Sequence, residues 1–276
     1  MSLIIGGIEC KPLTQSIERI SGIIWGPAKS GKTTLTSTAP KPILYLMFDP
    51  DGAACLQRSE DIHVLDLSQA PDRVVESFKT PDTQAMRDLE KHLTTGIKTI
   101  IFDSLTSFGG KALCFGVERG ALLAMKNNTE KPTLEQPGFV GYGHKNTYTN
   151  QALKTLLSMT KLHNIHFIAI AHEDAPKMDK KGEVVVSQTI MLGSSLVVEV
   201  PKDVSEVWYM HDKDNKREIV LRPRHPLKPM GSRMFDTRNV SSFYWKYDAI
   251  TQQGEGIEAW YETWKTNEFN KISVPK

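Results

Sequence analysis

The sequence predicts an α/β fold with a mainly parallel central sheet flanked by helices and an antiparallel β extension near its end. Three observations support this class. Apolar runs alternate with amphipathic stretches through the first 172 residues, these runs are continuous, and after His172 short β-type runs are separated by turn residues. Alternating strands and helices indicate a parallel sheet, and continuous apolar strands suit a sheet covered on both faces.

The elements follow in chain order. Five apolar runs are expected strands: 19–25, 42–48, 62–67, 99–103 and 165–171. Apolar residues recur at helical spacing in 82–93 and 149–162, and 256–265 is an expected closing helix. The runs EVVVSQTIML, SEVWYMHD, KREIVLRP and SSFYWKYD predict the antiparallel extension. Segment 115–145 is polar, rich in Gly, Pro and Asn, and too long for a plain connection, so we expect it to be functional or mobile.

Composition limits the class of protein. We expect a single domain over residues 1–276, with an α/β core in 19–172, a β-rich extension in 173–250 and a helix with a tail in 251–276. The net charge of +2 does not identify an anionic partner. Three cysteines without CxxC spacing are expected to be reduced thiols, which argues against a zinc site. No run approaches the roughly 18 apolar residues of a membrane span, and no signal peptide is recognisable, so we expect a cytoplasmic protein without a membrane partner.

Residues 26–33, GPAKSGKT, fit the phosphate-loop (Walker A) pattern GxxxxGK[ST]. The pattern follows an apolar strand and precedes a plausible helix start, which is the context that the motif requires. Backbone N–H groups of such a loop wrap phosphates, Lys32 reaches the β and γ phosphates, and the Thr33 hydroxyl binds Mg²⁺. The expected ATP-binding residues are Gly26, Pro27, Ala28, Lys29, Ser30, Gly31, Lys32, Thr33 and Thr34.

A second motif supplies the expected metal partner but leaves the catalytic base open. Asp103 ends the strand TIIFD and is expected to hold Mg²⁺ through its water shell, as a Walker-B acid does. Many ATPases carry a glutamate directly afterwards, but Ser104 occupies that place. The strand PILYLMF runs into DPDG, which offers two other acids. RecA-type ATPases have their base at the end of this strand, so a resemblance to them implies Asp51 as the base, with Asp49 as the alternative. Both acids would otherwise serve only the turn.

His172 ends the apolar run IHFIAIAHE. RecA-type ATPases keep a polar sensor of the γ phosphate at this strand end, so the resemblance described next implies that role for His172. The alternative is a hydrogen-bonded histidine at a strand end, with Glu173 as the next candidate.

Together these pieces resemble the RecA superfamily, and within it short bacteriophage ATPases such as the Sak-type single-strand annealing proteins. The resemblance covers residues 20 to about 236 through IIWGPAKSGKTTL, LYLMFDPDG, KTIIFDSLT, the pair Tyr142-Gly143, NIHFIAIAHED and LVVEVPKDVSEVWYM. It implies a RecA-like P-loop NTPase core. The chain departs from the family in two ways. The base position carries Asp51 where RecA has a glutamate, and segment 115–145 has no counterpart in the family.

The resemblance also implies partners. ATP would lie between subunits of a homo-oligomer, with basic residues acting across the interface; Arg224 and Lys228 lead, ahead of Arg222 and Arg233. Two loops would bind single-stranded DNA. The first lies within 106–145, the second is DAPKMDKKGEVVVSQ, and their candidate residues are Lys126, Lys131, Phe139, Tyr142, His144, Lys145, Lys177, Lys180 and Lys181.

The expected function is a slow, DNA-modulated, magnesium-dependent ATPase of phage recombination that promotes annealing or strand pairing. A single-strand-binding protein is a further expected partner. The alternatives are an AAA+ type helicase loader or remodeller, a nucleotide-sensing module with little turnover, and a small-molecule kinase.

Overall fold

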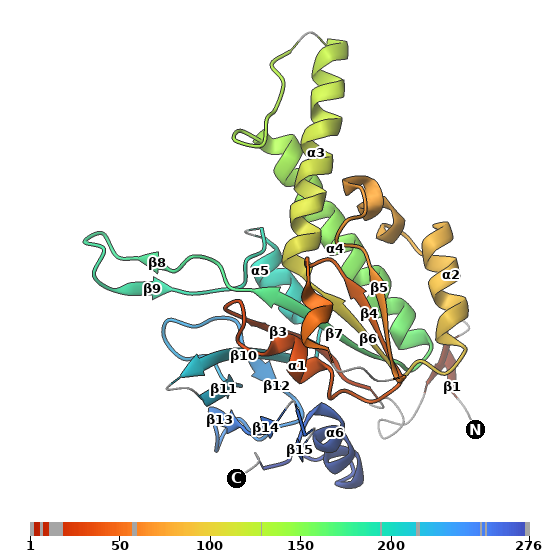
Figure 1. Ribbon diagram of the computed structural model, residues 1–276, viewed down its shortest axis with the longest axis vertical. Helices are drawn as coiled ribbons and strands as arrows, with labels where there is room; N and C mark the ends of the chain where they lie inside the picture. Colours follow the sequence, from red (N-terminus) through yellow and green to blue (C-terminus); the bar gives the residue numbers. More distant parts are fainter. Residues whose placement is uncertain are drawn as a thin grey trace.

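A single large sheet runs through the centre of the protein (Figure 1). The computed structural model describes residues 3–5, 8–10, 19–56, 60–127, 129–193, 195–213, 216–248, 250–251 and 253–273. Within these residues the sheet has nine strands in the order β5-β4-β6-β7-β3-β10-β11-β13, and β12 also pairs with β10. The strands are β3 (Ser21–Gly26), β4 (Ile43–Met47), β5 (Ile62–Asp66), β6 (Thr99–Asp103), β7 (His166–His172), β10 (Glu206–Lys213), β11 (Lys216–Val220), β12 (Gly231–Ser232) and β13 (Ser242–Trp245).

The first part of this sheet is parallel and the last part antiparallel. β5, β4, β6, β7, β3 and β10 pair in parallel, whereas β11, β12 and β13 pair antiparallel to their neighbours. The predicted fold class is therefore confirmed, and the extension continues the same sheet. β7 lies between β3 and β6, so the carboxyl ends of the phosphate-loop strand and the Asp103 strand flank the end of the His172 strand.

Helices cover both faces of the sheet. Beneath α2 (Gln84–Leu93), α3 (Leu105–Asn127) and α4 (Gly138–Leu162) lies one buried cluster, which includes Phe48, Phe102 and Phe108. Beneath α1 (Lys32–Thr36) and α6 (Ile257–Thr266) lies a second, which includes Trp208 and Trp260. The apolar faces of 82–93 and 149–162 pack as expected, because Met86, Leu153 and their helical neighbours belong to the first cluster.

Shorter elements complete the chain. They are β1 (Leu3–Ile5), β2 (Ile8–Cys10), β8 (Lys177–Met178), β9 (Val185–Ser187), β14 (Tyr247–Asp248), β15 (Gln253–Gly254), α5 (Leu196–Glu199) and the 3₁₀ helices η2 (Gly52–Cys55), η3 (Asp72–Phe78) and η4 (Val200–Lys202). Within the described ranges, no helix combines the length and apolar character that crossing a membrane requires.

Segment 115–145 differs from the sequence-based expectation. It consists mainly of the second half of α3 and the start of α4, which begins eleven residues before the helix expected at 149–162. We call residues 115–145 the helical arm, and it projects beyond the sheet in Figure 1. Close packing replaces an apolar stripe here: a Cβ added at Gly116 would lie only 2.5 Å from the Cβ of His144. Small residues at helix contacts are invisible to a search for apolar periodicity.

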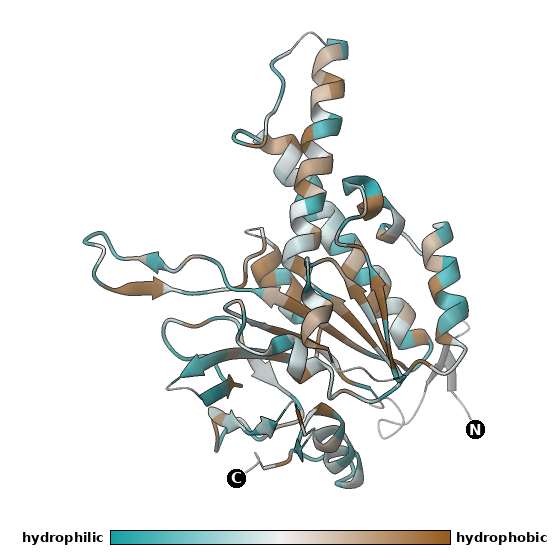
Figure 2. Cartoon of the chain, viewed as in Figure 1, coloured by the Kyte–Doolittle hydropathy of each residue, from teal (hydrophilic) through white to brown (hydrophobic). Residues whose placement is uncertain are grey.

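A second projection, the hairpin arm, comprises residues 174–189 and contains β8 and β9. It leaves the sheet at the carboxyl end of β7 and extends sideways in Figure 1. Figure 2 shows a hydrophilic β8 beside a hydrophobic β9, and Val184 and Val186 are exposed.

β5 does not match the expectation of a strand covered on both faces. It is the edge strand next to β4, and Val64 and Leu65 are exposed. Its continuous apolar run therefore reflects strand propensity more than burial.

Candidate nucleotide-binding site

The phosphate loop joins β3 to α1 in a backbone conformation that its glycines permit. Gly26 has φ 150° and Gly31 has φ 95°, while Lys29 adopts φ 64° between them. A Cβ at Gly26 would lie 2.0 Å from the carbonyl oxygen of Met210, so no larger residue fits beside β10. The glycines of the pattern thus allow both the turn of the loop and the close approach of its backbone to β10.

Lys32 is folded back onto this loop. Its Nζ donates to the carbonyl oxygens of Gly26 (3.0 Å) and Pro27 (2.6 Å), and the residue is buried. Burial lowers the pKa of Lys32 to about 8, although the negative charges of Asp103, Asp49 and Glu173 oppose the shift. The ammonium thus faces three acids without a direct ion pair to any of them, and a bound phosphate would restore its preference for the charged form.

The two expected magnesium residues are brought together. The Thr33 hydroxyl donates to Oδ2 of Asp103 at 2.9 Å, and Asp103 is buried at the end of β6. Burial, and then the charge of Asp49, raise the pKa of Asp103 to about 6. The neighbouring negative carboxylates of Asp103 and Asp49 together favour a bound cation.

Asp49 is the centre of the polar network beside Asp103. Oδ1 of Asp49 accepts hydrogen bonds from the hydroxyls of Ser104 (2.9 Å) and Ser107, and Oδ2 accepts one from Nε2 of His172 (3.0 Å). Burial raises the pKa of Asp49, but the hydrogen bonds from His172, Ser107 and Ser104 outweigh it, so that pKa lies below its ordinary value. Ser104, which stands where many ATPases have a glutamate, thus helps to orient a carboxylate from another strand.

Asp51 is placed differently. It precedes η2 with φ 56°, its side chain is exposed, and it makes no capping hydrogen bond. The expectation that Asp51 faces the γ phosphate while Asp49 serves the turn is thus at odds with this geometry. Strand β4 ends at Met47. In the turn that follows, the Asp49 side chain lies against His172 at the end of β7, whereas the Asp51 side chain points into solvent. The catalytic role of either acid stays a prediction.

His172 occupies the expected place at the end of β7, paired in register with Gly26 of β3. Its backbone N–H donates to Thr106 Oγ1 (2.9 Å), its Nε2 contacts Asp49, and its buried Nδ1 has no hydrogen-bond partner among the described residues. Glu173, the alternative, instead accepts hydrogen bonds from Tyr209 (3.0 Å) and Gln188 (2.6 Å), which tie it to the base of the hairpin arm.

The basic residues expected to act across an interface lie in the segment after β11. Arg224 forms an ion pair with Glu218 of its own chain (3.1 Å), and Lys228 is exposed. Arg222 and Arg233 are also exposed. With Val186 of the hairpin arm, Arg224 and Lys228 line a cavity of about 260 Å³. Their action across a subunit interface stays a prediction.

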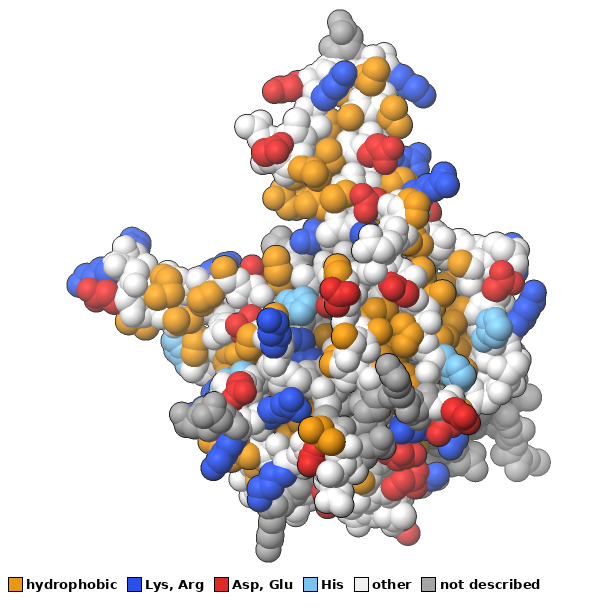
Figure 3. All heavy atoms as spheres, viewed as in Figure 1, with side chains coloured by type: hydrophobic (Ala, Val, Ile, Leu, Met, Phe, Trp, Pro, Cys, Tyr) orange, Lys and Arg blue, Asp and Glu red, His pale blue; other side chains and the backbone are white. Residues whose placement is uncertain are grey.

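The candidate DNA residues lie on the two arms. Lys126, Lys131, Phe139 and Tyr142 are exposed on the helical arm, and the Phe139 side chain is 99% exposed. Residues 144 and 145 are half-buried against α3, and burial lowers the pKa of Lys145. Lys177, Lys180 and Lys181 lie on the hairpin arm. Figure 3 shows Lys and Arg side chains at the hairpin tip and basic beside hydrophobic side chains on the helical arm.

Sequence reasoning missed two residues. Ser107 joins the Asp49 network one helical turn after Ser104, and the spacing of the two serines after the Walker-B acid was a usable signal. Arg217 of β11 lies beside the phosphate loop, since a Cβ at Gly31 would meet its Nε at 2.8 Å. No motif marks Arg217, because its position depends on the pairing of β11 with β10.

The residues present fit a magnesium nucleotide. Ser30 is buried in the loop, and its hydroxyl has no hydrogen-bond partner among the described residues, as expected of a group that awaits a phosphate oxygen. Thr33 and Asp103 would hold Mg²⁺ on one side only. Within the described ranges no group of three or more His, Cys, Asp or Glu forms a metal cage, so phosphates and water would supply the other ligands.

Comparison with known proteins agrees with a P-loop domain. The chain is similar to the crystal structure of the RadB recombinase, with 16% sequence identity and a TM-score of 0.43 over 83% of this chain and 88% of that chain. No curated protein matches the sequence. A family model described as an AAA domain matches residues 18–246, most of the 276 residues. This chain therefore belongs to the AAA domain family of nucleotide-binding P-loop proteins.

Proposed function

We propose that this protein is a magnesium-dependent ATPase that couples ATP binding and hydrolysis to the binding of single-stranded DNA in recombination. One observation carries the proposal. The strand that ends at the Asp49–His172 pair continues directly into the hairpin arm, which bears Lys177, Lys180 and Lys181. A residue beside the expected γ-phosphate position and a projection that bears three lysines therefore belong to one continuous segment.

In this proposal Asp49 is the general base in place of Asp51. Its carboxylate remains ionised at neutral pH, lies beside Asp103, and still has a lone pair on Oδ2 after accepting from His172. It would take the proton of the attacking water, while Lys32 stabilises the charge on the phosphates. Bound Mg²⁺ would neutralise phosphate charge next to Thr33 and Asp103.

His172 would report the state of the nucleotide to the hairpin arm. Its Nε2 is fixed by Asp49, and its Nδ1 would accept from an ordered water, or donate to a phosphate oxygen when the ring is protonated. Movement of this ring would displace the adjacent Glu173, which accepts a hydrogen bond from Gln188 at the base of the arm. Such a contact between a side chain at the phosphates and a projecting loop provides a physical route for coupling.

Single-stranded DNA would contact both arms. The lysines of the hairpin arm would contact phosphates individually, because Asp174, Asp179 and Glu183 balance their charge on the same arm. The exposed rings of Phe139 and Tyr142 on the helical arm are suited to base stacking.

Self-association is part of the proposal, in which Arg224 and Lys228 would contact the phosphates held by a neighbouring subunit. An Arg224→Ala/Lys228→Ala protein should bind ATP without turnover and regain part of the activity when mixed with Lys32→Ala protein. One interface in the mixed oligomer would combine an intact loop with intact basic residues. Failure to regain activity in a demonstrably mixed oligomer would indicate a site completed within one chain.

ATP turnover with and without single-stranded DNA is the central test. We expect slow turnover that changes on addition of DNA. Undetectable turnover at saturating ATP would favour a nucleotide-sensing module. Turnover that no single-stranded DNA changes would favour a remodeller or helicase loader of the AAA+ type, which the family match keeps as a second candidate. Against a remodeller, the described C-terminal part contains strands and α6 packed on the sheet, not a helical lid.

The finer assignment is a phage protein of the Sak type that acts in the cytoplasm of a bacterial host, beside a single-strand-binding protein. Its biochemical signature would be annealing of complementary strands coated with such a protein. Annealing that does not depend on ATP would separate this activity from the nucleotide site.

A further inference from the structure

Arg217 stands next to the phosphate loop although it lies far from it in the sequence. An added Cβ at Gly31 would meet Nε and Cζ of Arg217 at 2.8 and 2.9 Å. β11 runs antiparallel to β10 and β10 runs parallel to β3, so the start of β11 reaches the sheet edge at which β3 ends. Arg217 is thus a residue of the same chain at the nucleotide site.

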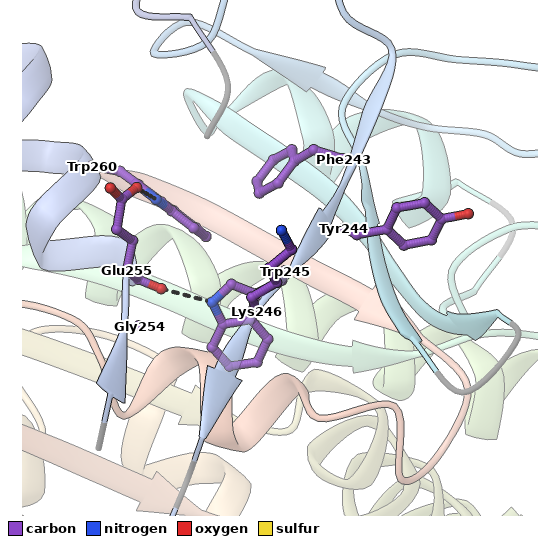
Figure 4. A pocket seen from close by; sticks show the side chains of 7 residues that line it. All are labelled: Phe243, Tyr244, Trp245, Lys246, Gly254, Glu255 and Trp260. Carbon is purple, nitrogen blue, oxygen red and sulfur yellow. Dashed lines mark hydrogen bonds between the residues drawn. The ribbon is translucent and has the colours of Figure 1, made fainter. Parts of the chain in front are cut away.

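Its guanidinium rests on a fixed aromatic ring. Arg217 lies opposite Trp245 in the β11–β13 register, with Cζ 5.5 Å from the ring centre. The Trp245 indole N–H donates to the carbonyl oxygen of Glu255 at 2.8 Å, and the Glu255 carboxylate accepts from Trp260 at 3.3 Å (Figure 4). The hydrogen bond of its indole N–H and the burial of its ring fix Trp245 in place. The fixed ring keeps the flat guanidinium of Arg217 in one orientation.

A cavity opens beside this pair. It has a volume of about 240 Å³ and is lined by the rings of Phe243, Trp245 and Trp260 and by Glu255 (Figure 4). Pockets that enclose whole ligands usually have about 300–1,000 Å³, so this one suits a single ring system of a larger ligand. Aromatic walls with a carboxylate at one side suit a nitrogen base that carries an amino group.

Arg217 is not among the charges that shift the pKa values of Lys32 and Asp103. The charges of Asp103, Asp49 and Glu173 shift the pKa of Lys32. The charges of Asp49, His172 and Lys32 shift the pKa of Asp103. That cluster marks the γ-phosphate and magnesium end. Arg217 instead contacts the loop at Gly31, where α1 begins.

Building on the proposed function, we propose that Arg217 and Trp245 form the stacking pair that binds the base of ATP in the chain that binds its phosphates. A planar guanidinium backed by an indole offers a flat, cationic surface to an aromatic base. The base would thus be recognised within one subunit even where residues of a neighbour complete the phosphate site.

Binding of ATP and of inorganic tripolyphosphate by the full chain, both with Mg²⁺, tests this inference. Arg217→Ala should weaken ATP binding about 10-fold, as expected for one stacking contact, and change tripolyphosphate binding less than about two-fold. Arg217→Lys should resemble Arg217→Ala, because an ammonium does not stack as a flat group does. Lys216→Ala is the matched control: this neighbour points to the opposite face, where its ammonium lies over Tyr244.

Trp245→Phe provides a second variant that keeps an aromatic ring in the core, and it should weaken ATP binding without changing tripolyphosphate binding. Equal losses for both ligands, with rescue by Arg217→Lys, would show a charge contact to phosphate and overturn the stacking role. Wild-type ATP affinity in Arg217→Ala would also overturn it. If the wild-type protein binds neither ligand, the proposed function fails instead.

Discussion

Replacing Asp49 by asparagine tests the site most directly, with Asp51→Asn as its matched control two residues away. The asparagine carbonyl can still accept from Ser104 and Ser107, so the change removes the charge and one charge-assisted hydrogen bond from His172. The cost in unfolding free energy should be about 1.5–3 kcal/mol at most. ATP affinity should stay the same or rise, because a negative charge beside the phosphates disappears.

Turnover should respond very differently. Loss of a positioned general base lowers a rate by about 10²–10⁴-fold, so Asp49→Asn should show at least a 10²-fold loss of phosphate release at saturating Mg²⁺ and ATP. Asp51→Asn should stay within about two-fold of wild type, because its exposed carboxylate lies outside the network. Thermal melting of both variants with and without ATP would establish that fold and binding persist.

The reverse pattern would refute the reasoning. If Asp51→Asn is inactive and Asp49→Asn is active, the turn after β4 rearranges when ATP binds and Asp51 moves inward. If both variants are active, the base lies elsewhere and Glu173 is the next residue to replace.

Three further predictions follow from the same geometry. Lys32→Ala should remove ATP-dependent thermal stabilisation with an unchanged circular dichroism spectrum; a normal ATP shift would count against the phosphate-loop assignment. Magnesium and ATP should slow alkylation of the solvent-accessible Cys55, whose pKa partial burial raises and whose surroundings include Thr33, which is expected to bind magnesium; Cys114 is the internal control. Burial lowers the pKa of His166 to about 4, and its Nδ1 accepts from a backbone N–H. Because the folded pKa lies below the unfolded value of 6.5, stability should be full above pH 6.5 and fall by about 3 kcal/mol toward pH 4. Denaturant unfolding at both pH values should show a smaller fall in His166→Asn.

The parts of the fold that the sequence predicts correctly are those that short-range patterns encode. β3, β4, β6 and β7 lie within a few residues of their expected ranges, because a buried parallel strand must be a continuous apolar run. The helical arm was not predicted as helix, because its helices pack through small residues such as Gly116 without an apolar stripe.

The same division holds within the site. The sequence by itself determined the phosphate loop, Lys32 and Asp103, since backbone geometry and ligand chemistry require those residue types at that spacing. It favoured Asp51 over Asp49 as the base. Only the tertiary structure separates them: the turn with φ 56° at residue 51 sends that side chain outward, and His172, 123 positions away, meets Asp49 because β7 lies between β3 and β6. Arg217 likewise reaches Gly31 only through strand pairing, since contacts between distant segments depend on sheet order and register, which local sequence does not encode.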